Sequence, residues 1–189
     1  MSARPFIVGI GGTTRPGSSG ESMVRAVLAA TEDDGARTAM FGGAELAALP
    51  HFAPERGERT PEQLAFVAAI RSADGLVIGT PGYHGGISGL VKNAIDLLED
   101  LRADERVYFD GRAVGLIVVA AGWQAGGVTL QALRGVVHAM RGWPTPLGIT
   151  VNTAEQKPFD AEGRLADQGL RAQVAAQAGQ VMHMARMKR

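Results

Sequence analysis

The sequence predicts an α/β fold, a doubly wound parallel sheet with helices on both faces. Strand-like apolar segments alternate with amphipathic helical segments five times along the 189 residues. The clearest strand segments, Phe6–Ile10, Leu76–Ile78 and Ala113–Ala121, contain no charged residue, which is typical of parallel strands covered on both faces. Because crossovers between parallel strands are right-handed, this alternation gives three α/β/α layers. The length is that of one ordinary domain, so we expect a single domain over residues 1–189.

The first half of the chain contains three of the five expected strands. In order, the predicted elements are a strand Phe6–Ile10, a helix Ser22–Thr31, a strand Arg37–Phe41, a helix that begins at Thr60–Pro61, and a strand Gly75–Gly79. The helix that begins at Thr60 is expected to bury a stripe formed by Leu64, Val67, Ala68 and Ile70. Residues 42–59 form a long connection, which we expect to be mobile.

The second half continues the same alternation. Its predicted elements are a helix Ser88–Asp100, a strand Ala113–Ala121, a helix that ends at Met140, a strand Pro146–Val151 and a helix Gln168–Met187. Two glycine-rich segments, Thr80–Gly86 and Gly122–Gly127, are expected to be loops that follow the third and fourth strands.

The composition excludes several classes of function. Lys plus Arg equals Asp plus Glu at 19 each, so we expect neither a nucleic-acid partner nor an acidic membrane surface. The absence of cysteine excludes disulfides, thiolate nucleophiles and sulfur-ligated metals, so any redox chemistry must come from a cofactor. No signal-peptide pattern and no membrane-spanning apolar run is found, and we expect a cytoplasmic protein.

The turn after the first strand is a candidate phosphate site. It reads Gly11-Gly12-Thr13-Thr14-Arg15-Pro16-Gly17-Ser18-Ser19-Gly20. Free amides at a helix N-terminus stabilise an anion by about 0.3–1 kcal/mol, and a charge-assisted hydrogen bond from Arg15 adds roughly 1.5–3 kcal/mol. The same residues also fit an ordinary turn in which Ser19 or Ser22 caps the helix, so the sequence leaves both interpretations open.

Two better-known glycine loops do not fit this turn. A dinucleotide fingerprint G-x-G-x-x-G would begin at Gly9, but Thr14 stands at its third glycine, and the acidic residues Asp33 and Asp34 precede the second strand instead of ending it. A nucleotide P-loop requires Gly-Lys-Ser/Thr after the turn, and this chain has none there. The turn is therefore more typical of monophosphate recognition.

Loops rich in glycine and hydroxyl groups follow the first, third and fourth strands. In doubly wound sheets, ligands bind at the carboxyl ends of the strands, where the strand order reverses. We therefore expect these three loops to form one cleft that holds Arg15, Tyr83, His84 and Trp123. One loop offers phosphate chemistry, and the other two offer backbone amides, aromatic rings and glycines that let a flat group approach closely.

The glycine-rich loops and the residues that follow them resemble those of the NAD(P)H-dependent FMN reductase family. Two motifs carry the resemblance, the turn Gly12–Ser18 and the segment that begins Thr80-Pro81-Gly82-Tyr83 and ends Lys92-Asn93-Ala94-Ile95-Asp96. The resemblance implies a flavodoxin-like fold with strand order 2-1-3-4-5, FMN as cofactor and NADPH or NADH as co-substrate. It also implies a homodimer or homotetramer.

The resemblance assigns two sets of binding residues. The phosphate is assigned to Thr13, Arg15 and Ser18, and Ser19 or a backbone amide stands in for the Asn that the family often has at the position of Gly20. The segments beside the isoalloxazine ring are assigned to Pro81, Gly82, Tyr83, His84, Gly85, Gly122, Trp123, Gly126 and Gly127. The family often has Glu for Gly82 and Asn for His84. No metal and no catalytic side chain is expected, because the flavin itself carries hydride transfer.

Several of these residues also have a plain structural interpretation. Tyr83 is interpreted as a flavin-edge residue, whereas a loop histidine such as His84 is more often only a polar surface group. Trp123 could stack on a flavin or nicotinamide ring, or it could seal a subunit interface. Lys92, Asn93 and Asp96 lie inside a predicted helix, where packing roles are favoured over chemistry.

The function implied by the resemblance is that of an NAD(P)H-dependent FMN reductase. Hydride would pass from the nicotinamide to N5 of FMN, and the reduced flavin would go to a partner monooxygenase or to another acceptor. The sequence leaves alternatives. They are a quinone, azo or metal-oxyanion reductase with FMN as prosthetic group, a flavodoxin-like electron carrier, and a flavin-binding protein without turnover. Carriers usually present an acidic face, which a neutral chain does not favour.

Overall fold

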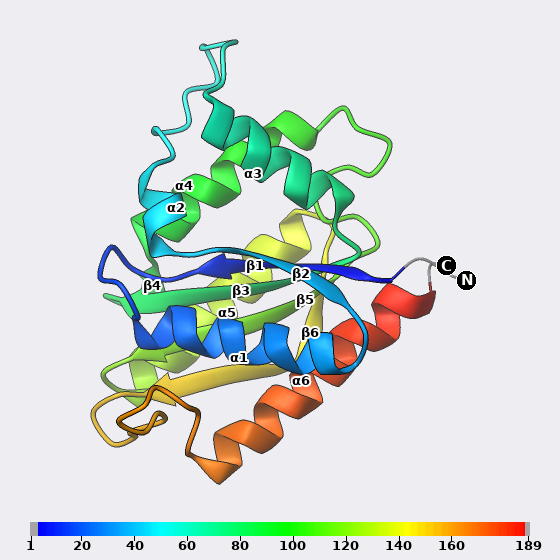
Figure 1. Ribbon diagram of the computed structural model, residues 1–189. Coiled ribbons are helices and arrows are strands. Elements are labelled where there is room, and N and C mark those ends of the chain that lie inside the picture. Colours follow the sequence, from blue (N-terminus) through cyan, green and yellow to red (C-terminus); the bar gives the residue numbers. More distant parts are fainter. Residues whose placement is uncertain (1–3, 188–189) are drawn as a thin grey trace.

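The computed structural model describes residues 4–187 and contains a twisted parallel sheet covered by helices on both faces (Figure 1). The sheet is built from β1 (Phe6–Gly11), β2 (Arg37–Phe41), β3 (Gly75–Tyr83), β5 (Ala113–Ala120) and β6 (Trp143–Asn152). Their spatial order is β2-β1-β3-β5-β6, and every neighbouring pair on this path is parallel. A short strand β4 (Gly86–Ile87) pairs antiparallel with the end of β3. With β4 set aside, this is the predicted order 2-1-3-4-5, so the fold class is confirmed.

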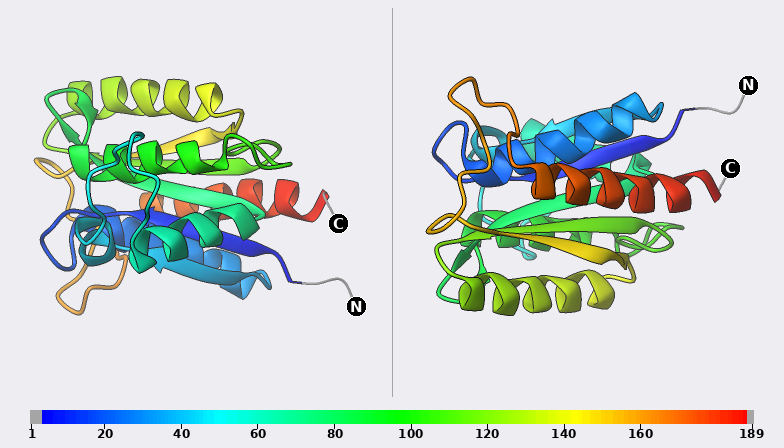
Figure 2. Two further views of the ribbon diagram at one scale, coloured as in Figure 1. Left: turned by 90° about the horizontal axis from the view of Figure 1, so that it is seen from above. Right: turned by 90° about the horizontal axis from the view of Figure 1, so that it is seen from below.

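Helices cover the two faces of the sheet unequally. They are α1 (Ser19–Asp33), α2 (Gly43–Ala47), α3 (Pro61–Ser72), α4 (Gly89–Leu97), α5 (Trp123–Ala139) and α6 (Gln168–Met187), with a 3₁₀ turn η1 (Leu98–Leu101) after α4. Helices α1 and α6 lie on one face, and α2 to α5 lie on the other (Figures 1 and 2). Each face therefore has its own hydrophobic core, one around Phe66, Leu98 and Leu116 and the other around Val24, Ile117 and Met182.

The N-terminal ends of two helices differ from the prediction. Helix α1 begins at Ser19 and is capped by Ser18, whose side chain accepts a hydrogen bond from the amide of Glu21, so neither Ser19 nor Ser22 is the cap. Helix α5 begins at Trp123, and the segment Gly122–Gly127 is therefore mostly its first turns instead of a loop. The glycines in this segment are typical of a loop, but Gly126 and Gly127 lie in helical backbone and only Gly122 precedes the helix.

The buried face of α3 was predicted partly wrongly. Leu64 and Ala68 are exposed, and the buried residues are Gln63, Phe66, Val67 and Ile70. Thr60 and Gln63 form a reciprocal capping box at the start of the helix, and the side that carries Phe66 packs into the core of this face of the sheet. The Phe66 ring packs edge-on against Phe41 of β2, with ring centroids 5.0 Å apart.

The third strand is longer than predicted. Strand β3 continues from Gly79 to Tyr83 and then turns back into β4 through His84 and Gly85, so the expected loop 80–86 is mostly a β-hairpin. Both turn residues have positive φ, +53° at His84 and +76° at Gly85, as a two-residue hairpin of type I′ requires.

The long connection between β2 and α3 includes a short helix, α2, that the sequence analysis did not predict. Leu46 and Leu49 are buried there as anchors. Asn93 of α4 accepts a hydrogen bond from the amide of Phe52 at 2.8 Å and donates to the carbonyl of Pro50 at 3.2 Å. The asparagine of the Lys92–Asp96 motif therefore has a structural role, as predicted. No helix among residues 4–187 has the length and apolar character needed to cross a membrane.

Candidate functional site

The turn between β1 and α1 presents hydrogen-bond donors at one end of the molecule. The first-turn amides of Ser19 and Gly20 have no acceptor within the helix, as at any helix N-terminus. The Thr13 hydroxyl accepts a hydrogen bond from the amide of Arg15 at 3.2 Å, which shapes the turn. Within residues 4–187 the Arg15 guanidinium makes no hydrogen bond or ion pair, and it is exposed. The turn therefore combines uncommitted amides, hydroxyls and one free positive charge.

These donors line a cavity of about 290 Å³ at the carboxyl ends of the central strands. The lining residues are Thr13, Arg15, Ser18, Ser19, Gly20, Pro81, Gly82, Tyr83, Val119, Ala120, Ala121 and Thr153. The cavity lies at the carboxyl ends of the neighbouring strands β1 and β3. The chain continues from β1 to β2 on one side and from β3 to β5 on the other, and doubly wound folds bind ligands at such a reversal of strand order. Figure 2 shows the β1–α1 turn, the β3–β4 hairpin and the segment after β6 together at this end.

The electrostatics of this cavity favour an anion. Arg15 is its one charged lining residue, and no carboxylate lines it. The nearest acid along the chain, Glu21, points away. Its carboxylate accepts a hydrogen bond from the amide of Gly43 at 3.1 Å and pairs with Arg25 at 2.7 Å. A phosphate at the start of α1 would meet the guanidinium and the helix amides without a competing negative charge.

On its β3 side the cavity is lined by Pro81, Gly82 and Tyr83. Thr80, which is fully buried, accepts a hydrogen bond from the amide of Ser88 at 3.1 Å and so ties the end of β3 to the start of α4. At Gly82 a Cβ would lie 3.0 Å from Thr129 Oγ1 and 3.1 Å from Ala120 Cβ, so α5 and β5 leave little room for a side chain there. The main chain of residues 81–83 therefore remains accessible from the cavity.

The structure brings together only part of the predicted binding set. All five residues of the first loop, together with Pro81, Gly82 and Tyr83, line the cavity, and their role toward a ligand stays a prediction. His84 and Gly85 do not line it, because they form the exposed tip of the hairpin. A histidine tolerates the left-handed φ of this turn, which gives a conformational reason for His84.

Gly122, Trp123, Gly126 and Gly127 also lie outside the lining of the cavity. Gly126 is buried in α5, where a Cβ would approach Thr150 Cγ2 of β6 to 2.3 Å. Close packing between helix and strand is thus a sufficient reason for glycine at this position. At Gly127 an added Cβ would meet no atom within 4 Å, so packing does not require glycine there.

Four lining residues were not predicted, namely Val119, Ala120, Ala121 and Thr153. Val119 and Ala120 end β5 and Ala121 follows it, directly before the expected third loop, so their place at the carboxyl end of a predicted strand is the signal that could have identified them. Thr153 lies after β6, where the sequence analysis placed no site residue. Its amide donates to the carbonyl of Ala120 at 2.9 Å, a contact that local sequence patterns do not reveal.

Trp123, the first residue of α5, comes two residues after the lining residue Ala121 and has half of its surface accessible. Its exposed fraction is 51%, and its indole N–H donates to a carboxylate oxygen of Glu155 at 2.9 Å. Tyr83 at the end of the neighbouring strand is 57% exposed. Two large aromatic side chains therefore stand near the cavity without a covering layer.

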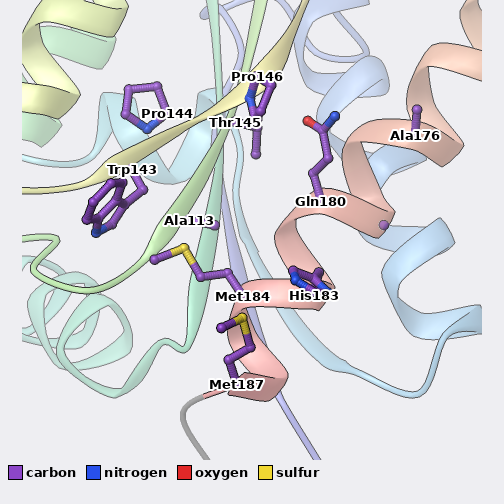
Figure 3. A pocket seen from close by; sticks show the side chains of 11 residues that line it. Ala113, Trp143, Pro144, Thr145, Pro146, Ala176, Gln180, His183, Met184 and Met187 are labelled. Atoms are coloured by element: carbon purple, nitrogen blue, oxygen red, sulfur yellow. The ribbon is translucent and has the colours of Figure 1, made fainter.

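A larger cavity lies elsewhere and has a different character. It measures about 860 Å³ and is enclosed by the start of β6 and the second half of α6 (Figure 3). Trp143, Pro144, Pro146, Met184 and Met187 give it an apolar lining, and His183 is its one titratable residue. It lies at the amino ends of the strands, the opposite end of the sheet from Arg15, so it does not belong to the same site.

Comparison with known proteins gives one family match. The family model of NADPH-dependent FMN reductases matches residues 5–156. An FMN-dependent NADPH-azoreductase of Staphylococcus haemolyticus (strain JCSC1435) is 33% identical over 99 residues, which are 50% of this chain and 47% of that protein. The protein of the same name from Staphylococcus aureus (strain USA300) is 36% identical over 88 residues, 44% of this chain and 41% of that one. The chain thus spans about half the length of the curated relatives it matches.

Solved structures share the fold at low identity. An oxidoreductase from Corynebacterium diphtheriae superposes with a TM-score of 0.73 and 21% identity, over 98% of this chain and 99% of that one. The flavoenzyme NAD(P)H:(acceptor) oxidoreductase FerB from Paracoccus denitrificans gives a TM-score of 0.75 and 17% identity, over 96% and 99%.

Proposed function

The chain belongs to the NADPH-dependent FMN reductase family, and from this premise we propose that it binds FMN in the cavity beside Arg15 and catalyses oxidation of NADPH or NADH. We further propose that the whole chain is one FMN-binding domain. One feature carries the proposal: a guanidinium, hydroxyls and helix amides converge on a cavity whose lining contains no carboxylate. That donor set matches a phosphate monoester.

The residues present fit the phosphate end of FMN. Arg15 supplies the charge, the hydroxyls of Thr13 and Ser19 supply donors, and Gly20 adds a backbone amide. Ser18 keeps its oxygen as the helix cap, yet its hydroxyl hydrogen is still able to donate. At Gly20 a Cβ would have only Val119 Cγ2 as a neighbour, at 4.0 Å, so the Asn that the family often has there would fit sterically. Its absence therefore removes a contact that this backbone would allow.

The residues around the other half of the cavity fit a flat ring system. Pro81, Gly82 and the small side chains of Ala120 and Ala121 leave the backbone accessible, and a second cavity of about 140 Å³ adjoins at Tyr83. When bound there, FMN supplies the redox chemistry, taking up hydride from the nicotinamide and passing electrons to an acceptor. Arg15 and Tyr83 are the only titratable lining residues, so the chain's part is binding, orientation and exclusion of water.

A flavin titration followed by a nicotinamide assay tests this function. FMN fluorescence is measured as the protein is added, with riboflavin as the ligand that lacks the phosphate. We expect FMN to bind more tightly than riboflavin, and NADPH or NADH to be oxidised only when FMN is present. Equal affinity for the two flavins would refute the phosphate site, and FMN binding without nicotinamide oxidation would refute the enzyme.

The strength of binding separates two modes of use. Micromolar affinity, about −8 kcal/mol, lets reduced FMN leave for a separate acceptor such as a monooxygenase. Nanomolar affinity, about −12 kcal/mol, keeps FMN as a prosthetic group that reduces acceptors in place. We further propose assembly as a homodimer or homotetramer, which sedimentation measures directly.

A further inference from the structure

The hydrogen bond between Trp123 and Glu155 joins two segments that border the FMN cavity. Trp123 comes two residues after Ala121, and Glu155 comes two residues after Thr153, and both of those neighbours line the cavity. The donor and acceptor are 32 residues apart in sequence and 2.9 Å apart in space. The hydrogen bond therefore links the segment that follows β5 to the segment that follows β6.

Both ends of this hydrogen bond are held by rigid structure. Trp123 is the first residue of α5, and Gly126 of the same turn is packed directly against β6. Glu155 lies in a tight turn organised by Asn152, which is buried. The Asn152 side chain accepts from the amide of Ala154 at 3.1 Å, and its carbonyl accepts from the amide of Glu155 at 3.1 Å. These hydrogen bonds hold the backbone of the turn that carries Glu155, and the bond from the indole N–H joins its carboxylate to Trp123.

The Trp123 indole has 51% of its surface exposed although its N–H is bound to Glu155. Tryptophan combines a large apolar ring with one polar N–H, so this bond satisfies the polar group and leaves apolar ring surface uncovered. Tyr83 is exposed at the end of β3, the strand that pairs with β5. The rim thus offers aromatic surface on two sides of one cavity.

We propose that Trp123, oriented by Glu155, is the surface on which the electron acceptor stacks, and that it makes the site selective for flat aromatic acceptors over non-aromatic ones. The proposal rests on the function proposed above. Trp123 contacts the acceptor, whereas Glu155 is a positioning residue that acts through the indole. Aromatic stacking contributes beyond simple burial, so loss of the indole raises KM for a flat acceptor by about 5- to 10-fold.

Two acceptors of different shape test the selectivity. Menadione, a naphthoquinone, takes one hydride equivalent from NADPH and one proton from solvent to give the hydroquinone. Two ferricyanide ions take the same two electrons one at a time and have no aromatic face. In Trp123→Leu we expect KM for menadione to rise about 5- to 10-fold, while KM for ferricyanide and the Kd for FMN stay within about twofold of wild type. Trp123→Phe keeps a ring and should restore most of the menadione affinity.

A spectroscopic measurement tests the role of Glu155 without turnover. Trp143 lies in the separate apolar cavity of Figure 3, so Trp143→Phe leaves Trp123 as the only indole of the chain. In that background Glu155→Ala should lower the fluorescence anisotropy of Trp123 and raise KM for menadione, and Glu155→Gln, which keeps an oxygen acceptor, should do both to a smaller extent. Unchanged anisotropy in Glu155→Ala would overturn the positioning role.

The remaining outcomes separate failure of this proposal from failure of the proposed function. A wild-type protein that binds no FMN, or oxidises no NADPH, refutes the function and this inference with it. An active wild type whose Trp123→Leu variant loses both acceptors equally, or neither, leaves the function standing and overturns the stacking role. A change in sedimentation of Trp123→Leu with unchanged menadione kinetics would assign Trp123 to a subunit interface instead.

Discussion

Replacing Arg15 by alanine removes the only charged group that lines the proposed phosphate site. The side chain is exposed and has no partner among residues 4–187, so its loss breaks no internal contact. Folding and thermal stability should therefore remain those of the wild type. The effect is expected to appear only when a phosphate is bound.

The size of the effect follows from the exposure of the guanidinium. A hydrogen bond to a charged group is worth about 1.5–3 kcal/mol, but an exposed side chain is screened by salt and loses entropy when it is ordered. We therefore expect the lower part of this range, roughly 1.5–2 kcal/mol, or about a 10- to 30-fold weaker affinity for FMN. The amides of Ser19 and Gly20 remain, so binding is weakened but not abolished.

The assay compares FMN and riboflavin in wild type and Arg15→Ala by fluorescence titration at low and high salt. Riboflavin lacks the phosphate, so its affinity should change by less than about twofold. Salt should weaken FMN binding to the wild type more than to the variant. Arg25→Ala is the matched control, because it removes the same charge from the second turn of α1. The Arg25 side chain pairs with Glu21 and does not line the cavity.

Two results would refute this reasoning. Arg15→Ala that weakens FMN and riboflavin equally would mean that Arg15 acts on the ring or on folding instead of the phosphate. An Arg25→Ala variant that loses as much affinity as Arg15→Ala would mean that only the general positive field of the loop matters.

Three further predictions concern stability. Gly126→Ala places a Cβ 2.3 Å from the methyl group of Thr150 in β6 and should destabilise the fold by about 1–3 kcal/mol. The Cβ of Gly127→Ala meets nothing within 4 Å, so this variant should stabilise α5 by roughly 0.5–1 kcal/mol. Equal melting temperatures for the two variants would contradict this prediction. Asn93→Ala removes hydrogen bonds to the connection 49–52 and should cost about 1–3 kcal/mol in urea denaturation, but Lys92→Ala, which breaks only an exposed ion pair, should cost less than about 1 kcal/mol. Hydrogen bonds, first from the amide of Arg164, hold the pKa of Asp160 below its ordinary value, so its stabilisation is present above the unfolded-state pKa and is lost as pH falls through the lower folded-state value. The difference in melting temperature between wild type and Asp160→Asn should accordingly shrink on acidification, and a constant difference would speak against this linkage.

The sequence predicted the architecture well because its signals are local. Helix α6 was placed at Gln168–Met187, as observed, since a long amphipathic stretch carries a clear period of its own. The parallel, doubly wound sheet followed from five alternations and the handedness of crossovers, whereas the strand order was implied by the family resemblance. The β1–α1 turn was found because glycine, hydroxyl and arginine side chains between a strand and a helix point to anion binding whatever surrounds them.

Glycine misled the prediction of the third loop. The segment 122–127 contains three glycines, which predict a loop, yet α5 begins at Trp123. Gly126 is there because α5 packs so closely on β6 that no Cβ fits, and this requirement belongs to a contact between two elements. Likewise, Leu64 is exposed and Phe66 is buried because the packing of α3 against the rest of the fold decides which side of the helix is covered.

The sequence by itself determined the alternation of elements, the family motifs and the loop that presents Arg15. Only the tertiary structure decided which residues share the cavity, since Thr153 reaches it through a hydrogen bond to Ala120 and His84 leaves it at the tip of a hairpin. The hydrogen bond between Trp123 and Glu155 was likewise decided only by the tertiary structure. Periodicity and turn chemistry act over a few residues, whereas these contacts depend on how strands 30 or more residues apart are brought to the same end of one sheet.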